Sequence, residues 1–335
     1  MHARLHSEEN SARGRVSTGV MPEREFVDAC LQEAYRRYRN VDDGSVADYI
    51  PALAGVPADL FGLCAVGVSG LVSTAGDWDR EFSIQSISKP FLFALLCQRL
   101  GCAEARRRIG VNSSGLPFDS VMAIELHAGR TVNPMVNSGA IATTSLVPGA
   151  TVEQRWHFIS DGLSAFAGRS LALDEDVYRC EARTNHRNRG MAQLLRSYGR
   201  LNGDVDEVID LYTRQCALSV DVKDLATMGA TLADGGVNPR TGEQVIDSTC
   251  CARVLAVLAT AGMYEQSGDW LYEVGLPGKS GVSGGIVTIA PGKGGLATFS
   301  PPLDEAGNSV RGQLASRFLS GELGLNLFVS SVAPR

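Results

Sequence analysis

Strand-like segments near both ends of the chain enclose a long helical stretch, and this order limits the possible folds more than any other feature. A short apolar run at 61–68 ends at a Gly/Ser turn, as a buried strand does. The patterns predict further strands at 71–74, 82–84, 283–289, 296–299 and 309–312, and helices at 23–39, 85–100, 152–168, 188–199, 221–234, 248–263 and 313–323. We therefore predict an α/β (α+β) fold, in which both ends complete one sheet and a helical part is inserted between them.

Charge and hydropathy exclude several kinds of protein. The chain has 335 residues, with 31 Lys and Arg against 37 Asp and Glu, and 44% of its residues are hydrophobic. This balance excludes a wholly disordered chain. A net charge of −6 does not supply the basic face that binds nucleic acid. The longest apolar runs, 91–97 and 254–263, are shorter than the ~18–20 residues that span a bilayer. We therefore expect neither nucleic acid nor a membrane as a partner.

The N-terminal residues and the cysteines favour a reduced, cytoplasmic protein. Residues 1–20 are polar and mixed in charge, without the apolar stretch of an export signal. We expect a disordered extension there, with Met21 as an alternative start. The eight cysteines form no C-x-x-C pair, and such scattered cysteines are typical of buried thiols in a cytosolic protein. The five histidines are dispersed, so we predict no metal site.

Ser86 and Lys89 form an S-x-x-K pattern at the start of a predicted helix. Residues three apart share one face of a helix, so the serine hydroxyl and the lysine amine can meet. A serine hydroxyl becomes nucleophilic when a neighbouring base takes its proton, and lysine is such a base when burial lowers its pKa. The pattern is short, and a capping serine beside a solvated lysine is the alternative interpretation.

A second pattern, Lys279-Ser280-Gly281, begins 190 residues after Lys89. An S-x-x-K followed by K-[ST]-G on a strand is the order seen in β-lactamases and penicillin-binding proteins. There the lysine and the hydroxyl would face an anionic group of the substrate, and N–H groups of the strand edge would stabilise an oxyanion. The alternative interpretation is a glycine-rich turn.

Two polar segments either bind a ligand or tie loops together. Segment 133–140 carries Asn133 and Asn137 among apolar and glycine residues, and buried amides need partners. In segment 181–188, Glu181 suits a substrate ammonium and Asn188 suits an amide or carboxylate, whereas the alternative is a solvated loop with a helix cap. Three tyrosines beside small or turn-forming residues are also typical of the edge of a core: Tyr49, Tyr212 and Tyr264.

Together these segments resemble the glutaminase family, the serine-dependent glutaminases that share the β-lactamase-like fold. The resemblance covers about residues 25–330, and the matching stretches follow the order of the family: 48–51, 82–89, 133–141, 187–188, 212–216, 262–264 and 275–285. It implies a β-lactamase/transpeptidase-like architecture, with an antiparallel-dominated central sheet flanked by helices. Residues 21–335 are then a single catalytic domain, with a helical subdomain inserted at about 90–230.

The resemblance implies hydrolysis of L-glutamine to L-glutamate and ammonia, without a metal or an organic cofactor. In this chain Ser86 matches the nucleophile and Lys89 its activating base, and Tyr264 matches a residue that shuttles a proton. The backbone N–H groups of Ser86 and Val282 match the oxyanion hole. The positions that match substrate-binding residues are Tyr49, Ser86, Asn137, Glu181, Asn188, Tyr212, Tyr264 and Val282. Because the family usually forms dimers or tetramers, we expect a homodimer or homotetramer.

Two other functions stay open at this point. The first alternative is a different serine acyl hydrolase of this fold, such as a β-lactamase, peptidase or esterase. The second alternative is a catalytically silent binding protein. The missing export signal argues against a cell-wall substrate. The intact Ser86, Lys89 and Lys279 argue against a silent protein.

Overall fold

The computed structural model describes residues 20–330. The extension expected at 1–20 lies outside the described residues except for Val20, which is exposed. Met21, the next residue, packs against the hydrophobic core.

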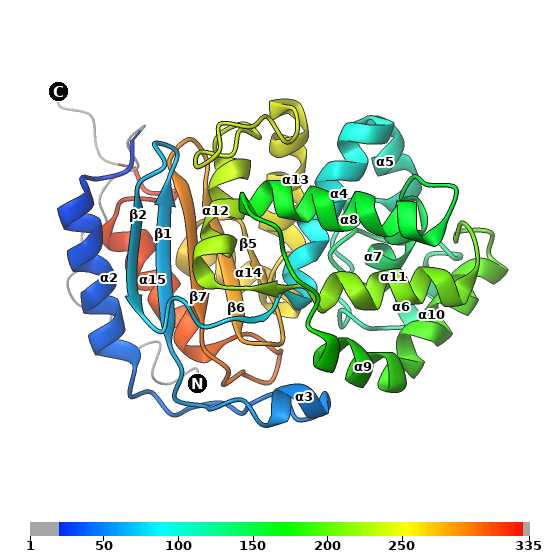
Figure 1. Cartoon of the computed structure of the whole chain (residues 1–335), viewed down its shortest axis with the longest axis horizontal. Coiled ribbons are helices and arrows are strands. Elements are labelled where there is room, and N and C mark those ends of the chain that lie inside the picture. Colours follow the sequence, from blue (N-terminus) through cyan, green and yellow to red (C-terminus); the bar gives the residue numbers. More distant parts are fainter. Residues whose placement is uncertain (1–19, 331–335) are drawn as a thin grey trace.

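Five strands form an antiparallel central sheet in the order β2-β1-β7-β6-β5 (Figure 1). The register pairs Gly62 of β1 with Phe299 of β7, so a strand from the first part of the chain lies beside one from the last part. This arrangement confirms that both ends complete one sheet. The strands are β1 (Gly62–Gly67), β2 (Val72–Gly76), β5 (Gly278–Ser280), β6 (Gly285–Ala290) and β7 (Gly294–Phe299).

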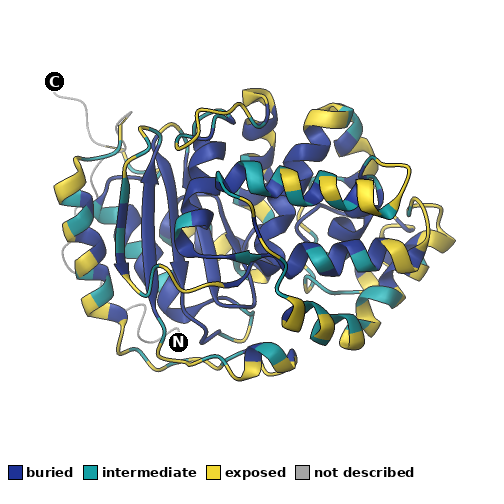
Figure 2. Cartoon of the chain, viewed as in Figure 1, coloured by how far each residue is buried: buried dark blue, intermediate teal, exposed yellow. Residues whose placement is uncertain are grey.

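Both faces of the sheet are covered, which is why β1, β6 and β7 are buried along their whole length (Figure 2). The edge strand β2 alternates between buried and more exposed residues. Leu63 and Ala65 of β1 pack into one hydrophobic cluster, together with α2 (Arg24–Tyr38), α14 (Ser267–Val274) and α15 (Val310–Glu322). The intervening residues Cys64 and Val66 face the other cluster, which includes α12 (Val222–Ala233).

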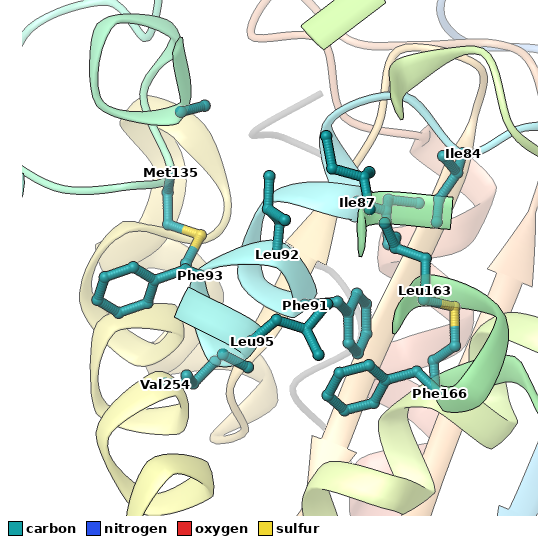
Figure 3. Packing of buried hydrophobic residues seen from close by; sticks show 14 of the residues in the cluster. Ile84, Ile87, Phe91, Leu92, Phe93, Leu95, Met135, Leu163, Phe166 and Val254 are labelled. Carbon is teal, nitrogen blue, oxygen red and sulfur yellow. The ribbon is translucent and has the colours of Figure 1, made fainter. Parts of the chain in front are cut away.

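The helical part lies beside the sheet, and α4 runs through its middle (Figure 1). Residues 88–97 of α4 are all buried, because this helix is packed on every side. Figure 3 shows Phe91 beside Phe166 and Phe93 beside Met135, in different directions from the helix. The helices here are α4 (Ser88–Leu100), α5 (Cys102–Ile109), α6 (Met122–Leu126), α7 (Asn137–Ser145), α8 (Val152–Ala167), α9 (Glu175–Thr184), α10 (His186–Ser197) and α11 (Val205–Cys216).

The remaining elements are one long helix and several short pieces. The long helix is α13 (Ser248–Ala261), and the short pieces are α3 (Pro51–Ala54), the 3₁₀ turns η1 (Gln85–Ile87) and η2 (Tyr264–Gln266), and a small sheet of β3 (Phe82–Ser83) and β4 (Ser219–Val220). Among residues 20–330, no helix is both long and apolar enough to cross a membrane.

Two strand predictions differ from the structure. The strand predicted at 82–84 exists as β3, but it pairs with β4 instead of joining the central sheet. The strand predicted at 309–312 is wrong, because α15 already begins at Val310. The Ser309 side chain accepts a hydrogen bond from the N–H of Gly312 and so caps that helix, a role that an apolar-polar pattern does not reveal.

Candidate active site

A cavity of about 1210 Å³ is lined by residues from the helical part and from the segments around the sheet. Its walls include most of the predicted site residues: Tyr49, Ser86, Asn137, Glu181, Asn188, Tyr212 and Val282. The other two, Lys89 and Tyr264, are buried and contact residues of this wall. The structure therefore brings these nine residues together at one cavity.

Ser86 lies in the turn η1 immediately before α4 and is 8% exposed. The preceding residue, Gln85, has a φ of 51°, which residues with a side chain rarely adopt. Its carbonyl accepts a hydrogen bond from Ser88 Oγ (2.7 Å), which in turn accepts one from Nε2 of the buried Gln215 (2.9 Å). These bonds hold the strained turn that places Ser86 on the cavity wall.

Lys89 is 1% exposed and follows Ser86 by one helical turn. Its Nζ donates to Met135 O (3.2 Å) and to Asn137 Oδ1 (2.6 Å). Burial lowers the pKa of Lys89 to about 8, because an ammonium loses its hydration in the interior. A neutral amine that donates both protons keeps one lone pair, and that lone pair is free to accept a proton from Ser86. No hydrogen bond between Ser86 and Lys89 is present among the described residues.

Asn137 and Asn188 link the lysine to the cavity. Asn137 begins α7, and its Nδ2 donates to Asn188 Oδ1 on α10 at 3.1 Å. Its backbone N–H donates to Phe118 O at 2.8 Å. The series of hydrogen bonds from Lys89 to Asn137 and from Asn137 to Asn188 thus fixes the orientation of two amide groups on the cavity wall.

Glu181 lies on α9, so the alternative of a solvated loop is wrong for this residue. The Asp174 side chain caps α9 by accepting from the N–H groups of Asp176 and Val177. Gln85 Nε2 donates to Glu181 Oε1 at 2.5 Å. Burial raises the pKa of Glu181 to about 7, and the hydrogen bond from Gln85 opposes this rise.

Tyr264 has a φ of 54° and is buried beside the nucleophile position. Its hydroxyl donates to Ser280 O at 3.2 Å, and its ring lies 4.5 Å from the ring of Phe118. Burial raises the pKa of Tyr264, and a hydrogen bond with Ser86 acts in the opposite direction. The tyrosine hydroxyl is thus within hydrogen-bonding reach of the serine hydroxyl.

Lys279 does not face the substrate cavity, and the prediction that it meets an anionic substrate group is wrong. The residue lies on β5, is 0% exposed, and is absent from the cavity wall. Its Nζ donates to Ser280 O at 2.7 Å and lies 4.2 Å from the centre of the Tyr264 ring. Burial, and then the charge of Lys89, lower its pKa well below the usual value. The Lys279 amine therefore contacts Tyr264 and does not reach a substrate in the cavity.

The remaining predicted residues occupy different depths of the cavity. Tyr49 is 60% exposed and lies at the rim, whereas Tyr212 is 3% exposed and burial raises its pKa. The backbone N–H groups of Ser86 and Val282 have no hydrogen-bond partner among residues 20–330. Two N–H groups on a cavity wall without partners can bind an oxygen that develops negative charge.

The sequence did not single out Gln85 and Gln215. Both are buried, and both brace the turn that carries Ser86. Both glutamines lie inside stretches that resemble the family, close to proposed site residues. A buried amide needs hydrogen-bond partners, so this position is the signal by which the sequence indicates their role. Within residues 20–330, no group of three or more His, Cys, Asp or Glu side chains could hold a metal ion.

Comparison with known proteins agrees with this geometry. Residues 44–328 match the model of the family described as glutaminase. "Glutaminase 2" of Yersinia pestis is 59% identical over 315 residues, which cover 94% of this chain and 93% of that protein. A glutaminase of Colwellia psychrerythraea is 48% identical over 92% of this chain and 99% of its own length.

Solved structures are similar over most of the chain. The probable glutaminase ybaS has a TM-score of 0.91 and 45% identity, covering 92% of this chain and 100% of its own. A probable glutaminase from Bacillus subtilis, complexed with 6-diazo-5-oxo-L-norleucine, has a TM-score of 0.83 and 32% identity, with 92% and 99% covered. The close matches confirm the β-lactamase-like fold, which the glutaminase structures share. The chain therefore belongs to the glutaminase family.

Proposed function

We propose that this protein hydrolyses L-glutamine to L-glutamate and ammonia, with Ser86 as the nucleophile. The observation that carries the proposal is the meeting of three groups at one place on the cavity. These are the Ser86 hydroxyl on the cavity wall, the buried Tyr264 hydroxyl within its reach, and the buried Lys89 amine one helical turn away. Membership of the glutaminase family supports the choice of glutamine among the possible amides.

The polar groups of the cavity suit the three polar groups of glutamine. The Glu181 carboxylate suits the α-ammonium by charge, and Gln85 holds it in place. The amides of Asn137 and Asn188 suit the α-carboxylate, together with the tyrosine hydroxyls of the wall. This arrangement leaves the side-chain amide to reach Ser86.

Acylation then follows from the protonation states. The neutral form of Lys89 takes the proton of Ser86 Oγ as that oxygen attacks the amide carbon of glutamine. The N–H groups of Ser86 and Val282 bind the oxyanion. The C–N bond breaks when the proton held by Lys89 passes through Tyr264 to the nitrogen, so ammonia leaves, Lys89 is neutral again and a γ-glutamyl ester remains on Ser86.

Deacylation reverses these proton transfers with water in place of Ser86. Water loses a proton to the same basic groups and attacks the ester carbon. The bond to Ser86 Oγ breaks, and the serine recovers its proton. Glutamate leaves, and every group returns to its starting state without an added cofactor.

The remaining expectations are part of the same proposal. We propose that residues 21–335 act as one catalytic domain with a helical subdomain at about 90–230. We also propose a homodimer or homotetramer located in the cytoplasm. Size-exclusion chromatography with light scattering measures the mass in solution, and a monomer at micromolar concentration would contradict the oligomer.

The test of the function is ammonia release from L-glutamine by purified protein. Wild type is expected to release ammonia and glutamate in equal amounts, and Ser86→Ala is expected to lose at least about 10⁴-fold in kcat. Ser197→Ala, which changes an exposed serine on α10, is the matched control and should keep wild-type activity. Hydrolysis of an ester or a β-lactam without hydrolysis of glutamine would favour another serine acyl hydrolase instead.

A further inference from the structure

Three of the eight cysteines, although far apart in sequence, gather at one place away from the cavity. Cys102 is the first residue of α5, Cys250 lies in the first turn of α13, and Cys97 lies near the end of α4. Cys102 Sγ lies 3.5 Å from Cys250 Sγ, and burial, followed by the neighbouring Cys102, raises the pKa of Cys97. All three are free thiols.

We propose that Cys102 and Cys250 are a site of reversible oxidation, at which a low-molecular-weight disulfide converts the two thiols into an intramolecular disulfide. Their sulfurs already touch, so bond formation requires only a closing movement from 3.5 Å to ~2 Å. Cys102 is partly exposed, whereas Cys250 is 5% and Cys97 is 1% exposed. An oxidant therefore meets Cys102 first.

The reaction is two successive thiol–disulfide exchanges. The Cys102 thiolate attacks one sulfur of the small disulfide, whose S–S bond breaks to release one thiol and leave a mixed disulfide on Cys102. Cys250 Sγ then attacks Cys102 Sγ as its proton passes to the departing sulfur, and the mixed disulfide breaks to release the second thiol. Two protein thiols are oxidised, and one small disulfide is reduced to two thiols.

Cys250 reacts only in the second step, because it is shielded from the oxidant but lies in contact with Cys102. Burial and the neighbouring Cys102 raise the pKa of Cys250 to about 12, so this thiol does not react from solvent. Its Sγ also lies 3.6 Å from Oε1 of Gln98, which bonds with Asp247 at the start of α13. These bonds hold Cys250 against α4 and Cys102.

The disulfide would tie the start of α13 to the first residue of α5, which follows directly after the end of α4. Both α4 and α13 approach the active site at their opposite ends. α4 begins at Ser88 beside the nucleophile, and α13 ends at Ala261, three residues before Tyr264. Because the sulfurs are already in contact, the bond does not need to move either site end. We expect a stabilised protein with unchanged catalysis, in which kcat and KM stay within about twofold of the reduced form.

The experiment treats reduced, full-length protein with oxidised glutathione and maps peptides without reductant. The expected result is a cross-linked peptide pair containing Cys102 and Cys250, with a rise in Tm on the order of 5 °C that dithiothreitol reverses. Cys102→Ser should abolish both changes. Cys251→Ser, next to Cys250 on the same helix, should keep both.

Three outcomes would overturn the proposal. They are a bond between Cys97 and Cys102, a stable glutathione adduct on Cys102, and no change in mass after oxidation. Thermal unfolding of Cys102→Ser under reducing conditions checks that this variant is folded. Since Cys102 is partly exposed, its Tm should stay near that of reduced wild type.

Discussion

The two lysine-bearing motifs bury their amino groups equally, yet they give them different surroundings. Lys89 on α4 is 1% exposed and bonds to Asn137, an amide on the cavity wall. Lys279 on β5 is 0% exposed and contacts the Ser280 carbonyl and the Tyr264 ring. Both pKa values are lowered by burial. The comparison teaches that burial and a lowered pKa do not by themselves make a lysine catalytic. What decides its role is the group that its amine contacts.

The elements explain this difference. α4 begins at the cavity, and its first turn therefore places the Lys89 amine against Asn137 of the cavity wall. β5 is short and has all three residues buried, so its lysine turns toward the neighbouring η2 turn. We propose that Lys89 activates Ser86, whereas Lys279 positions Tyr264.

The largest effect is expected for Lys89→Met, which removes the base but keeps an unbranched side chain. We expect kcat to fall about 10³-fold with KM changed less than about threefold, because the amine acts on Ser86 and does not bind glutamine. Steady-state kinetics measure this, and thermal unfolding checks the fold. A change confined to KM would mean that Lys89 only positions the substrate.

A smaller loss is expected for Lys279→Met. Without the amine against its ring, Tyr264 loses part of its positioning, and a misplaced group costs up to about 10²-fold in kcat. KM should stay near the wild-type value, because Lys279 is absent from the cavity wall. A large rise in KM with unchanged kcat would show that Lys279 binds substrate, and its proposed role in positioning Tyr264 would then be wrong.

The last prediction concerns the pH dependence and separates the ionisation of Glu181 from that of Lys89. Glutamine binding needs ionised Glu181, with a pKa of about 7, and acylation needs neutral Lys89, with a pKa of about 8. Both requirements fail as the pH falls, so log(kcat/KM) should decline with a slope approaching about two below pH 6. In Glu181→Gln the slope should approach about one. An unchanged slope would mean that Glu181 does not titrate in this range.

Much of this site followed from the sequence, because its residues stand in short motifs with a strong resemblance to one family. Strands β1, β6 and β7 were also predictable, since they are apolar runs next to glycine turns, whereas β5 contains no apolar run. The role of Lys279 was not, because the direction of a side chain on β5 depends on packing against η2. The bracing by Gln85 and Gln215 depends on hydrogen bonds between residues far apart in the chain, which periodicity does not report.

The most direct test of the central claim is covalent labelling with 6-diazo-5-oxo-L-norleucine, a glutamine analogue with a diazoketone in place of the amide. Peptide mapping should find the label on Ser86, and Lys89→Met should slow labelling by about the same factor as turnover. A label on another residue, or a labelling rate that Lys89→Met leaves unchanged, would contradict a Ser86 nucleophile activated by Lys89.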